Sequence, residues 1–426
     1  MPSTLSPTIE IKPACALADE PVQIQLSAFP SNCDVTIRVE THDDEGTRWQ
    51  SHAIFHTDDA GFVDLAVQSP RAGTYHRADV MGLFWSLTLD DGEAKGFSKG
   101  NLANTQITFT AFVDDKPLTT TTCERLFLAP GATRAVVREN GLAGTFFCPP
   151  GIDPLPAVIV LGGSSGGLEE ATASLLASHS YATLALAYFA YDHLPSDLQN
   201  IPLEYFETAI QWLQAQPRVR GDTIGVMGRS RGGELALLLG ATFPILKAVV
   251  AHVPSGFIWG ESPWTFRGEP LPHVPSLPSD DFERQVYSKS PIALTPLFLR
   301  DLDDLDAIQN AAIPVEKINA PVLLISAQDD QMWPSAYMSE LVMARLQKHQ
   351  HPFPDEHISY PGAGHFINVP YLPATVTHRR HRVHGHDFAF GGNPPDIAVA
   401  QVDAWRRILG FLETQLAPHE SSRGNV

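Results

Sequence analysis

The sequence predicts an all-β domain followed by an α/β domain with a mostly parallel sheet. Three observations support this: short alternating segments up to about residue 130, strands alternating with helices from about residue 140, and a glycine-flanked serine between a strand and a helix. The chain has 426 residues, more than one typical domain of ~150 residues. We expect domains over residues 1–135 and 136–426.

The first half contains short segments in which polar and apolar residues alternate. Residues 22–26, 35–39 and 106–112 follow this pattern, and the acidic, glycine-containing segments 43–46 and 58–61 read as turns. Period-two alternation with frequent turns is typical of half-buried strands in an antiparallel sandwich. We therefore expect an all-β sandwich in the N-terminal domain.

The second half changes to longer apolar runs and helical periodicity. Leu203, Phe206, Ile210 and Leu213 recur at steps of 3, 4 and 3, which places them on one face of a helix. The expected strands are residues 157–161, 182–187, 223–227, 248–251 and 322–326, with helices around 169–178 and from Arg231. Strands alternating with helices predict a parallel sheet covered on both faces.

The alternation lapses over about residues 253–320, which are rich in proline, tryptophan and phenylalanine. This stretch lies between two expected sheet strands, so it is an insertion in the α/β domain. Such an insertion often caps a substrate pocket, and a passive surface excursion is the alternative.

The composition excludes several classes of protein. There are 48 acidic and 29 basic side chains, a net charge of −19, which argues against a sequence-independent nucleic-acid binder. No run of ~18 apolar residues exists, so we expect no membrane span. The first 17 residues lack the apolar core of a signal peptide. Four cysteines in this length suit free thiols in the cytoplasm: Cys15, Cys33, Cys123 and Cys148.

The strongest motif is residues 228–232, which fit G-x-S-x-G around Ser230. An expected strand over 224–227 precedes it and an expected helix over 233–239 follows. Strand, turn and helix in this order form the setting of a nucleophile elbow in an α/β hydrolase. The helix N-terminus would bring free N–H groups and the positive end of its dipole beside the Ser230 oxygen.

A serine hydroxyl needs a base, and the order in this fold is serine, acid, histidine. Two adjacent acids follow the expected strand 322–326; we favour Asp330, with Asp329 as the alternative. His365 lies later, within the glycine-rich segment 362–366. The sequence thus predicts a triad of Ser230, Asp330 and His365.

Stabilising a tetrahedral intermediate requires donors for its oxyanion. One expected donor is the backbone N–H of Arg231, and the other comes from the glycine-rich loop 162–167, at Ser164 or Ser165. A phosphate cradle is an alternative for this loop, but it has no P-loop lysine and no dinucleotide-binding spacing.

Residues 378–386 concentrate histidine and arginine in an otherwise acidic chain. A solvated loop is one interpretation. The other is capture of a substrate's phosphates by Arg379, Arg380 and Arg382, with Arg229 beside the serine as a further candidate. The spacing is not that of a zinc site, and we predict no metal and no cofactor.

Beyond these motifs, nearly the whole chain resembles the family of type I acyl-CoA thioesterases and bile acid-CoA:amino acid N-acyltransferase. In the first half the resemblance lies in residues 17–21, 49–55, 59–65 and 81–86. In the second half it lies in residues 185–191, 230–235, 329–333 and 401–405. It implies an immunoglobulin-like N-terminal domain and an α/β-hydrolase domain.

The resemblance also implies an activity. The family's nucleophile, acid and base fall on Ser230, Asp330 and His365, which implies hydrolysis of an acyl thioester through an acyl-serine, as in lipid metabolism. Members that conjugate amino acids carry cysteine at the elbow, so serine favours water as the acceptor. The thiol is coenzyme A or, alternatively, a carrier protein bearing an acyl or polyketide chain. An acyltransferase, a carboxylesterase or peptidase, and an inactive binding scaffold are the rival classes.

Overall fold

The computed structural model describes residues 6–89, 95–275, 280–381 and 385–417. The chain divides into two compact units. One comprises the described residues of Met1–Leu128 with Phe366–Arg379 and Gly392–Val402. The other comprises those of Ala129–His365, Arg380–Gly391 and Asp403–Val426. The N-terminal unit thus includes two segments from the last part of the chain, Phe366–Arg379 and Gly392–Val402. No local sequence pattern predicts this.

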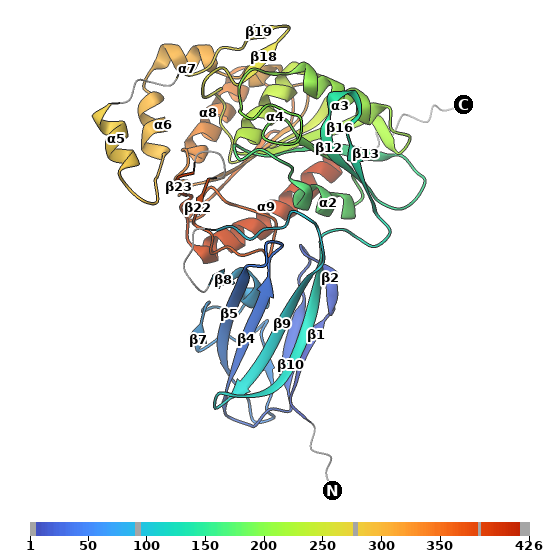
Figure 1. Ribbon diagram of the computed structural model, residues 1–426, viewed down its shortest axis with the longest axis vertical. Coiled ribbons are helices and arrows are strands. Elements are labelled where there is room, and N and C mark those ends of the chain that lie inside the picture. The colour runs from blue at the N-terminus through green and yellow to red at the C-terminus, as the bar shows by residue number, and fades with distance from the viewer. Residues whose placement is uncertain (1–5, 90–94, 276–279, 382–384, 418–426) are drawn as a thin grey trace. The chain divides into compact units, whose positions relative to one another are not determined.

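The N-terminal unit is built from two sheets (Figure 1). The smaller sheet has the order β1-β3-β6, with β1 Thr8–Lys12, β3 Gln23–Ser27 and β6 Val63–Asp64. The larger has the order β2-β10-β9-β4-β5-β7, with β8 paired to β5. Its strands are β2 Cys15–Leu17, β4 Asp34–His42, β5 Arg48–His56, β7 Ala72–Gly73, β8 Thr88–Leu89, β9 Thr105–Val113 and β10 Lys116–Leu126, and α1 is Gly82–Trp85.

Burial alternates along these strands as the sequence pattern predicts. In β4, Val35, Ile37 and Val39 are buried while their neighbours face outward. The same period-two burial recurs in β5 and β9. One side of each strand therefore forms a core, and the prediction of a sheet-rich N-terminal domain is confirmed.

The second unit contains an eight-stranded sheet of order β11-β12-β14-β13-β16-β17-β20-β21. Pairing is parallel from β14 through β13, β16, β17 and β20 to β21, and β12 is antiparallel to both β11 and β14. The strands are β11 Thr133–Val137, β12 Ala143–Cys148, β13 Leu155–Leu161, β14 Ala182–Ala187, β16 Val219–Arg229, β17 Leu246–His252, β20 Val322–Ala327 and β21 Glu356–Tyr360. The central strands are apolar on both faces because helices cover both sides.

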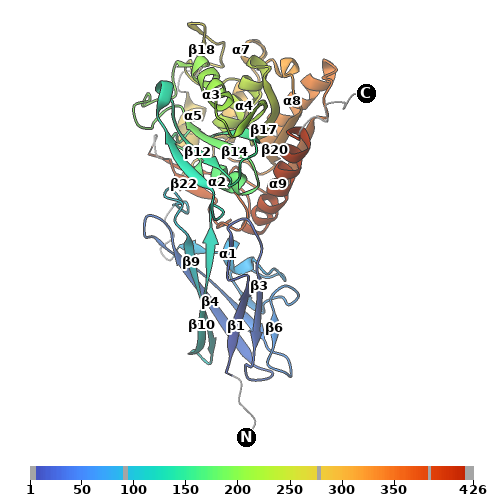
Figure 2. The same cartoon turned by 90° about the vertical axis from the view of Figure 1, so that its right-hand side faces the viewer.

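Helices flank this sheet on both faces (Figure 2). They are α2 Glu170–Ser178, α3 Glu204–Gln214, α4 Arg231–Thr242, α8 Ser335–Lys348 and the part of α9 (Pro394–Gln415) from Asp403 onward, which belongs to this unit. A short 3₁₀ turn spans Glu139–Gly141. Phe206, Ile210 and Leu213 of α3 are buried, as their spacing predicts. The sheet order, with a serine at the β16–α4 turn, is that of an α/β hydrolase. Within the described segments, no helix has the length and apolarity to cross a membrane.

Residues 253–320 form an insertion between β17 and β20. It contains β18 Trp264–Phe266, β19 Glu269–Pro270, α5 Asp281–Tyr287, α6 Thr295–Asp301, α7 Leu305–Ala311 and the 3₁₀ turn Val315–Lys317. Strand β18 pairs with β15 (Ile201–Pro202), which ties the insertion to the segment before α3. Two short strands, β22 His378–Arg380 and β23 Asp387–Ala389, precede α9.

We predict that Leu213→Ala destabilises the α/β unit by about 2–5 kcal/mol, because Leu213 is fully buried and its truncation leaves a cavity. Gln211→Ala, on the exposed side of the same helix, should change stability by less than about 0.5 kcal/mol. Chemical denaturation followed by tryptophan fluorescence measures both. Equal effects of the two substitutions would contradict this packing of α3.

Candidate active site

Ser230 occupies the turn between β16 and α4 in a left-handed backbone conformation. Its φ is 58° and its ψ is −122°, a region that costs a non-glycine residue about 1–3 kcal/mol. Backbone hydrogen bonds hold it there. The Ser230 N–H donates to the His252 carbonyl at 2.8 Å, and the Ser230 carbonyl accepts from Gly233 at 2.8 Å and Glu234 at 3.0 Å. The hydroxyl is thereby presented at the tip of a fixed turn.

Two glycines make this turn sterically possible. A Cβ at Gly228 would overlap the carbonyl of Gly232, and a Cβ at Gly232 would overlap the carbonyls of Leu161 and Gly162. The helix can therefore approach β13 and β16 only because both positions lack a side chain. This packing is the physical reason for the glycines that flank the serine in the motif.

Ser230, His365 and Asp330 form a continuous hydrogen-bonded relay. Ser230 Oγ lies 2.9 Å from His365 Nε2, and His365 Nδ1 lies 2.8 Å from Asp330 Oδ2. The other carboxylate oxygen of Asp330 accepts from the N–H groups of Met332 at 3.0 Å and Trp333 at 3.3 Å. Since a carboxylate only accepts, His365 Nδ1–H donates to Asp330, and Nε2 is left to accept the serine proton.

Close backbone packing places the imidazole. Gly364 lies against the backbone of Gly391 so tightly that a Cβ would overlap it, and the His365 N–H donates to the Phe390 carbonyl at 2.8 Å. His365 is 6% exposed and Asp330 5%. Asp329, the alternative acid, instead donates its N–H to Ala363 at 3.0 Å. Of the two adjacent acids, Asp330 is the one that contacts the ring.

A second histidine lies beneath the elbow. Burial, with the positive charges of Arg229 and His365, lowers the pKa of His252 to about 3. Its ring is therefore neutral at ordinary pH and adds no positive charge next to His365. Of these two histidines, His365 is the one whose Nε2 lies within hydrogen-bond distance of Ser230 Oγ.

The predicted oxyanion loop, residues 162–167, lies directly beside the serine. A Cβ on Gly163 would be 3.2 Å from Ser230 Cβ and 3.7 Å from its Oγ. Tyr188 Oη donates to the Gly162 carbonyl at 2.6 Å and fixes the start of the loop. Ser164 lines the cavity that contains Ser230, whereas Ser165 is not among the residues lining it.

The arginines that flank the serine are both engaged in ion pairs. Arg231 lines the cavity, but its Nη1 donates to Glu234 at 2.6 Å and its Nη2 to the Trp259 carbonyl. Arg229 donates to Glu169 at 3.0 Å and does not line the cavity. Each positive charge is thus compensated by a carboxylate of the same unit.

Only part of the basic segment 378–386 lines the cavity: His381 and His386 do, whereas Arg379 and Arg380 do not. Arg379 belongs to the N-terminal unit, and its guanidinium lies 5.8 Å from the ring centre of Phe366. Arg380 is exposed, next in sequence to His381, which does line the cavity. Arg382 lies outside the described residues. Among the described residues, no cluster of three or more histidine, cysteine or acidic side chains could hold a metal ion.

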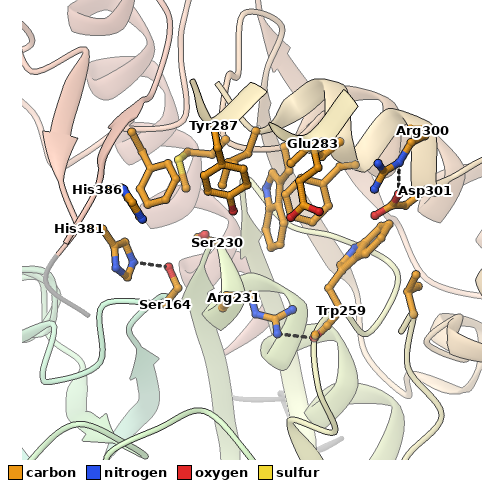
Figure 3. A pocket seen from close by; sticks show the side chains of 18 of the residues that line it. Ser164, Ser230, Arg231, Trp259, Glu283, Tyr287, Arg300, Asp301, His381 and His386 are labelled. Carbon is orange, nitrogen blue, oxygen red and sulfur yellow. Dashed lines mark hydrogen bonds and ion pairs between the residues drawn. The ribbon is translucent and has the colours of Figure 1, made fainter. Parts of the chain in front are cut away.

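The cavity at Ser230 has a volume of about 470 Å³ (Figure 3). Helices α5 and α6 of the insertion line it with Glu283, Tyr287, Phe298 and Arg300, among others, so the insertion forms part of its wall. An aromatic wall consists of Trp259, Phe298 and Trp333, whose rings contact one another edge to face. His381, His386 and Phe388 complete the cavity near Ser164.

Sequence reasoning missed Glu234 as a residue of the site. Its side chain is fully buried in α4, accepts from Trp264 Nε1 at 3.1 Å and pairs with Arg231. Burial raises the pKa of the Glu234 carboxyl, and the Arg231 charge opposes this rise. The signal that could have indicated Glu234 was an acidic residue at the start of an otherwise apolar helix, because a carboxylate buried there requires a cationic partner.

We predict that Asp330→Asn slows labelling of Ser230 by a fluorophosphonate about 10³-fold or more, because an amide cannot hold the imidazole as a carboxylate does. Asp329→Asn is the matched control and should label within about threefold of the parent rate. The labelling rate is measured by mass spectrometry, with thermal unfolding as a check on folding. A larger loss in Asp329→Asn than in Asp330→Asn would contradict this geometry.

Comparisons with known proteins cover almost all of the chain. The family described as "Acyl-CoA thioester hydrolase/BAAT N-terminal region" matches residues 19–139, and "BAAT / Acyl-CoA thioester hydrolase C terminal" matches residues 201–418. Acyl-coenzyme A thioesterase 1 of Mus musculus is 33% identical over 413 residues, covering 93% of this chain and 94% of that protein. Human acyl-coenzyme A thioesterase 2, mitochondrial, is 32% identical over 430 residues, covering 99% and 87%.

Bile acid-CoA:amino acid N-acyltransferase of Mus musculus is 33% identical over 422 residues, covering 96% of this chain and 98% of that protein. Among solved structures, a hyperthermophilic esterase from the archaeon Pyrobaculum calidifontis aligns with a TM-score of 0.42 at 17% identity, covering 66% of this chain and 85% of that one. The two family matches and the near-complete relatives show that the chain belongs to the acyl-CoA thioester hydrolase and bile acid-CoA:amino acid N-acyltransferase family.

Proposed function

We propose that the protein hydrolyses acyl-CoA thioesters to free acid and thiol through an acyl intermediate on Ser230. The observation that carries the proposal is the relay from Ser230 Oγ to His365 at 2.9 Å and on to Asp330 at 2.8 Å, at the wall of a cavity large enough for an acyl group. Membership of the family points to a thioester as the bond that is broken.

In the first half of the reaction, His365 Nε2 takes the proton of Ser230 as Oγ attacks the thioester carbonyl carbon. The backbone N–H of Arg231, at the N-terminus of α4, and an N–H of Ser164 or Ser165 stabilise the oxyanion. The C–S bond then breaks, and the thiolate takes the proton from the His365 imidazolium. The products of this half are the free thiol and an oxygen ester on Ser230.

In the second half, His365 takes a proton from water as the water oxygen attacks the acyl-Ser230 carbonyl. The bond from carbon to Oγ breaks, and the serine oxygen regains its proton from His365. Asp330 keeps its charge throughout and stabilises the imidazolium in both halves. Its burial, with two backbone N–H groups on its other oxygen, fixes the direction of the ring.

The second candidate is transfer of the acyl group to an amine or alcohol, which one relative's name describes for bile acids and amino acids. Serine at the elbow favours water as the final acceptor, because the oxygen ester of an acyl-serine is a less activated acyl donor than the thioester of an acyl-cysteine. A carboxylesterase or peptidase uses the same relay on oxygen esters or amides and is the third candidate.

Coenzyme A is the proposed thiol, and an acyl or polyketide chain on a carrier protein is the alternative. We propose the exposed Arg380, adjacent in sequence to the cavity residue His381, as the described arginine that contacts a phosphate of the substrate. The cytoplasm is our proposed location, since all four cysteines are free. We also propose an immunoglobulin-like arrangement for the N-terminal domain, on the basis of its two sheets and alternating burial.

We predict that Ser230→Ala lowers thiol release from acyl-CoA substrates by about 10³-fold or more while leaving their binding intact, because only the attacking oxygen is lost. Thiol release is followed with a chromogenic disulfide, and binding by calorimetry with the inactive variant. Retention of most activity by Ser230→Ala would rule out the acyl-serine mechanism.

The same assay separates the candidates. Hydrolysis predicts that thiol release is unchanged by added glycine, taurine or short alcohols and that free acid accumulates in equal amount. Acylated products in place of free acid would indicate an acyltransferase. Faster cleavage of matched p-nitrophenyl esters than of thioesters would indicate a carboxylesterase.

A further inference from the structure

We propose that the Ser164 hydroxyl is a side-chain donor to the oxyanion and that His381 is the positioning residue that directs its hydrogen. This inference rests on the proposed function and adds two residues to it. Neither the G-x-S-x-G motif nor the triad order points to these side chains. They come from segments 217 positions apart and meet at the cavity wall.

The pair lies beside the nucleophile. Ser164 Oγ is 3.1 Å from His381 Nε2, and both residues line the cavity that contains Ser230 (Figure 3). Ser164 directly follows Gly163, where an added Cβ would lie 3.2 Å from Ser230 Cβ. The hydroxyl therefore belongs to the loop from which an oxyanion donor is expected, on the side that faces the cavity.

His381 is held in place by two hydrogen bonds to its backbone and by an aromatic contact of its ring. His381 is 7% exposed, its N–H donates to the His386 carbonyl at 2.8 Å, and its carbonyl accepts from Gly385 at 2.9 Å. Its ring meets Phe388 edge to face, with centroids 5.8 Å apart. A fixed ring gives the 3.1 Å contact a defined direction, which a solvated surface histidine would lack.

The hydrogen count at Ser164 defines the role. A hydroxyl has one hydrogen and two lone pairs. When His381 Nε2 carries the hydrogen, it donates to Ser164 Oγ, and the serine hydrogen is free to point into the cavity. When Nε2 is the acceptor instead, the Ser164 hydroxyl donates its hydrogen to the ring, and only its lone pairs face the substrate. Only the first arrangement lets Ser164 donate to an oxyanion, so it is the one that the proposal requires.

The loop is already rigid where this donor sits. Tyr188 fixes the Gly162 carbonyl, and the Arg229–Glu169 pair ties the strand before the nucleophile to the residue that precedes α2. A donor on such a loop needs little reorganisation when negative charge develops. Removal of one oxyanion donor typically lowers kcat by about 10²–10³-fold, with a smaller effect on ground-state binding.

The decisive kinetic test compares Ser164→Ala, His381→Leu and the double variant with the parent on one acyl-CoA. We expect kcat to fall about 10²-fold in Ser164→Ala, which loses the donor, and by a smaller factor in His381→Leu, which loses only its positioning, with KM within about threefold in both. The double variant should be within about threefold of Ser164→Ala, because the hydrogen that His381 directs is already absent from Ser164→Ala. Ser164→Thr, which keeps a hydroxyl, should recover most of kcat.

A matched control pair lies within the eight-stranded sheet, on β20 and β21. Ser326 Oγ and His357 Nε2 form a similar pair at 2.8 Å, and neither residue lines the cavity. Ser326→Ala should leave kcat within about twofold while changing thermal stability. A kcat loss in Ser326→Ala equal to that in Ser164→Ala would show that any buried Ser–His pair has this effect, and it would overturn the assignment.

A second measurement isolates the oxyanion from turnover. A trifluoromethyl ketone analogue of acyl-CoA adds Ser230 Oγ to its carbonyl and places an oxyanion in the site, whereas a plain thioether analogue cannot. Ser164→Ala should weaken the binding of the ketone by about 10²-fold and leave the binding of the thioether unchanged. Equal weakening of both ligands, or unchanged kcat in Ser164→Ala, would overturn the role of Ser164. A parent protein that releases no thiol would overturn the proposed function itself.

Discussion

The left-handed backbone at Ser230 is the constraint on which the rest of the site depends. A residue with a side chain holds this conformation only because the turn is fixed by hydrogen bonds to His252, Gly233 and Glu234. The same turn brings α4 into backbone contact with β13 through Gly232. The groups that surround the serine oxygen are positioned relative to this one strained turn.

Charge compensation is the second organising feature. The chain carries a net charge of −19, yet acids sit where they neutralise particular cations: Glu234 with Arg231 and Glu169 with Arg229. The Arg229–Glu169 pair links the elbow to the residue before α2, and Arg231 links it to the insertion by donating to the Trp259 carbonyl. The arginines thus connect the nucleophile turn to the walls around it, which limits their availability to an anionic substrate.

The parts of the fold that sequence alone predicted are those set by local periodicity. Phe206, Ile210 and Leu213 are buried as their spacing indicates, and the elbow motif lies between a strand and a helix. The choice between Asp330 and Asp329 depended on the direction of two adjacent side chains, which the sequence left open; in the structure Asp330 is the acid that contacts His365, at 2.8 Å. Non-local contacts such as Ser164 with His381 had no signal in any single segment.

The central claim is that the acyl group passes through the oxygen of Ser230. Rapid mixing with an excess of acyl-CoA, acid quenching and mass spectrometry of the digested protein test it directly. The account predicts a transient mass increase of one acyl group, confined to the peptide that contains Ser230, which disappears as free acid forms. Release of thiol without any acylated peptide, or an adduct on another residue, would contradict it.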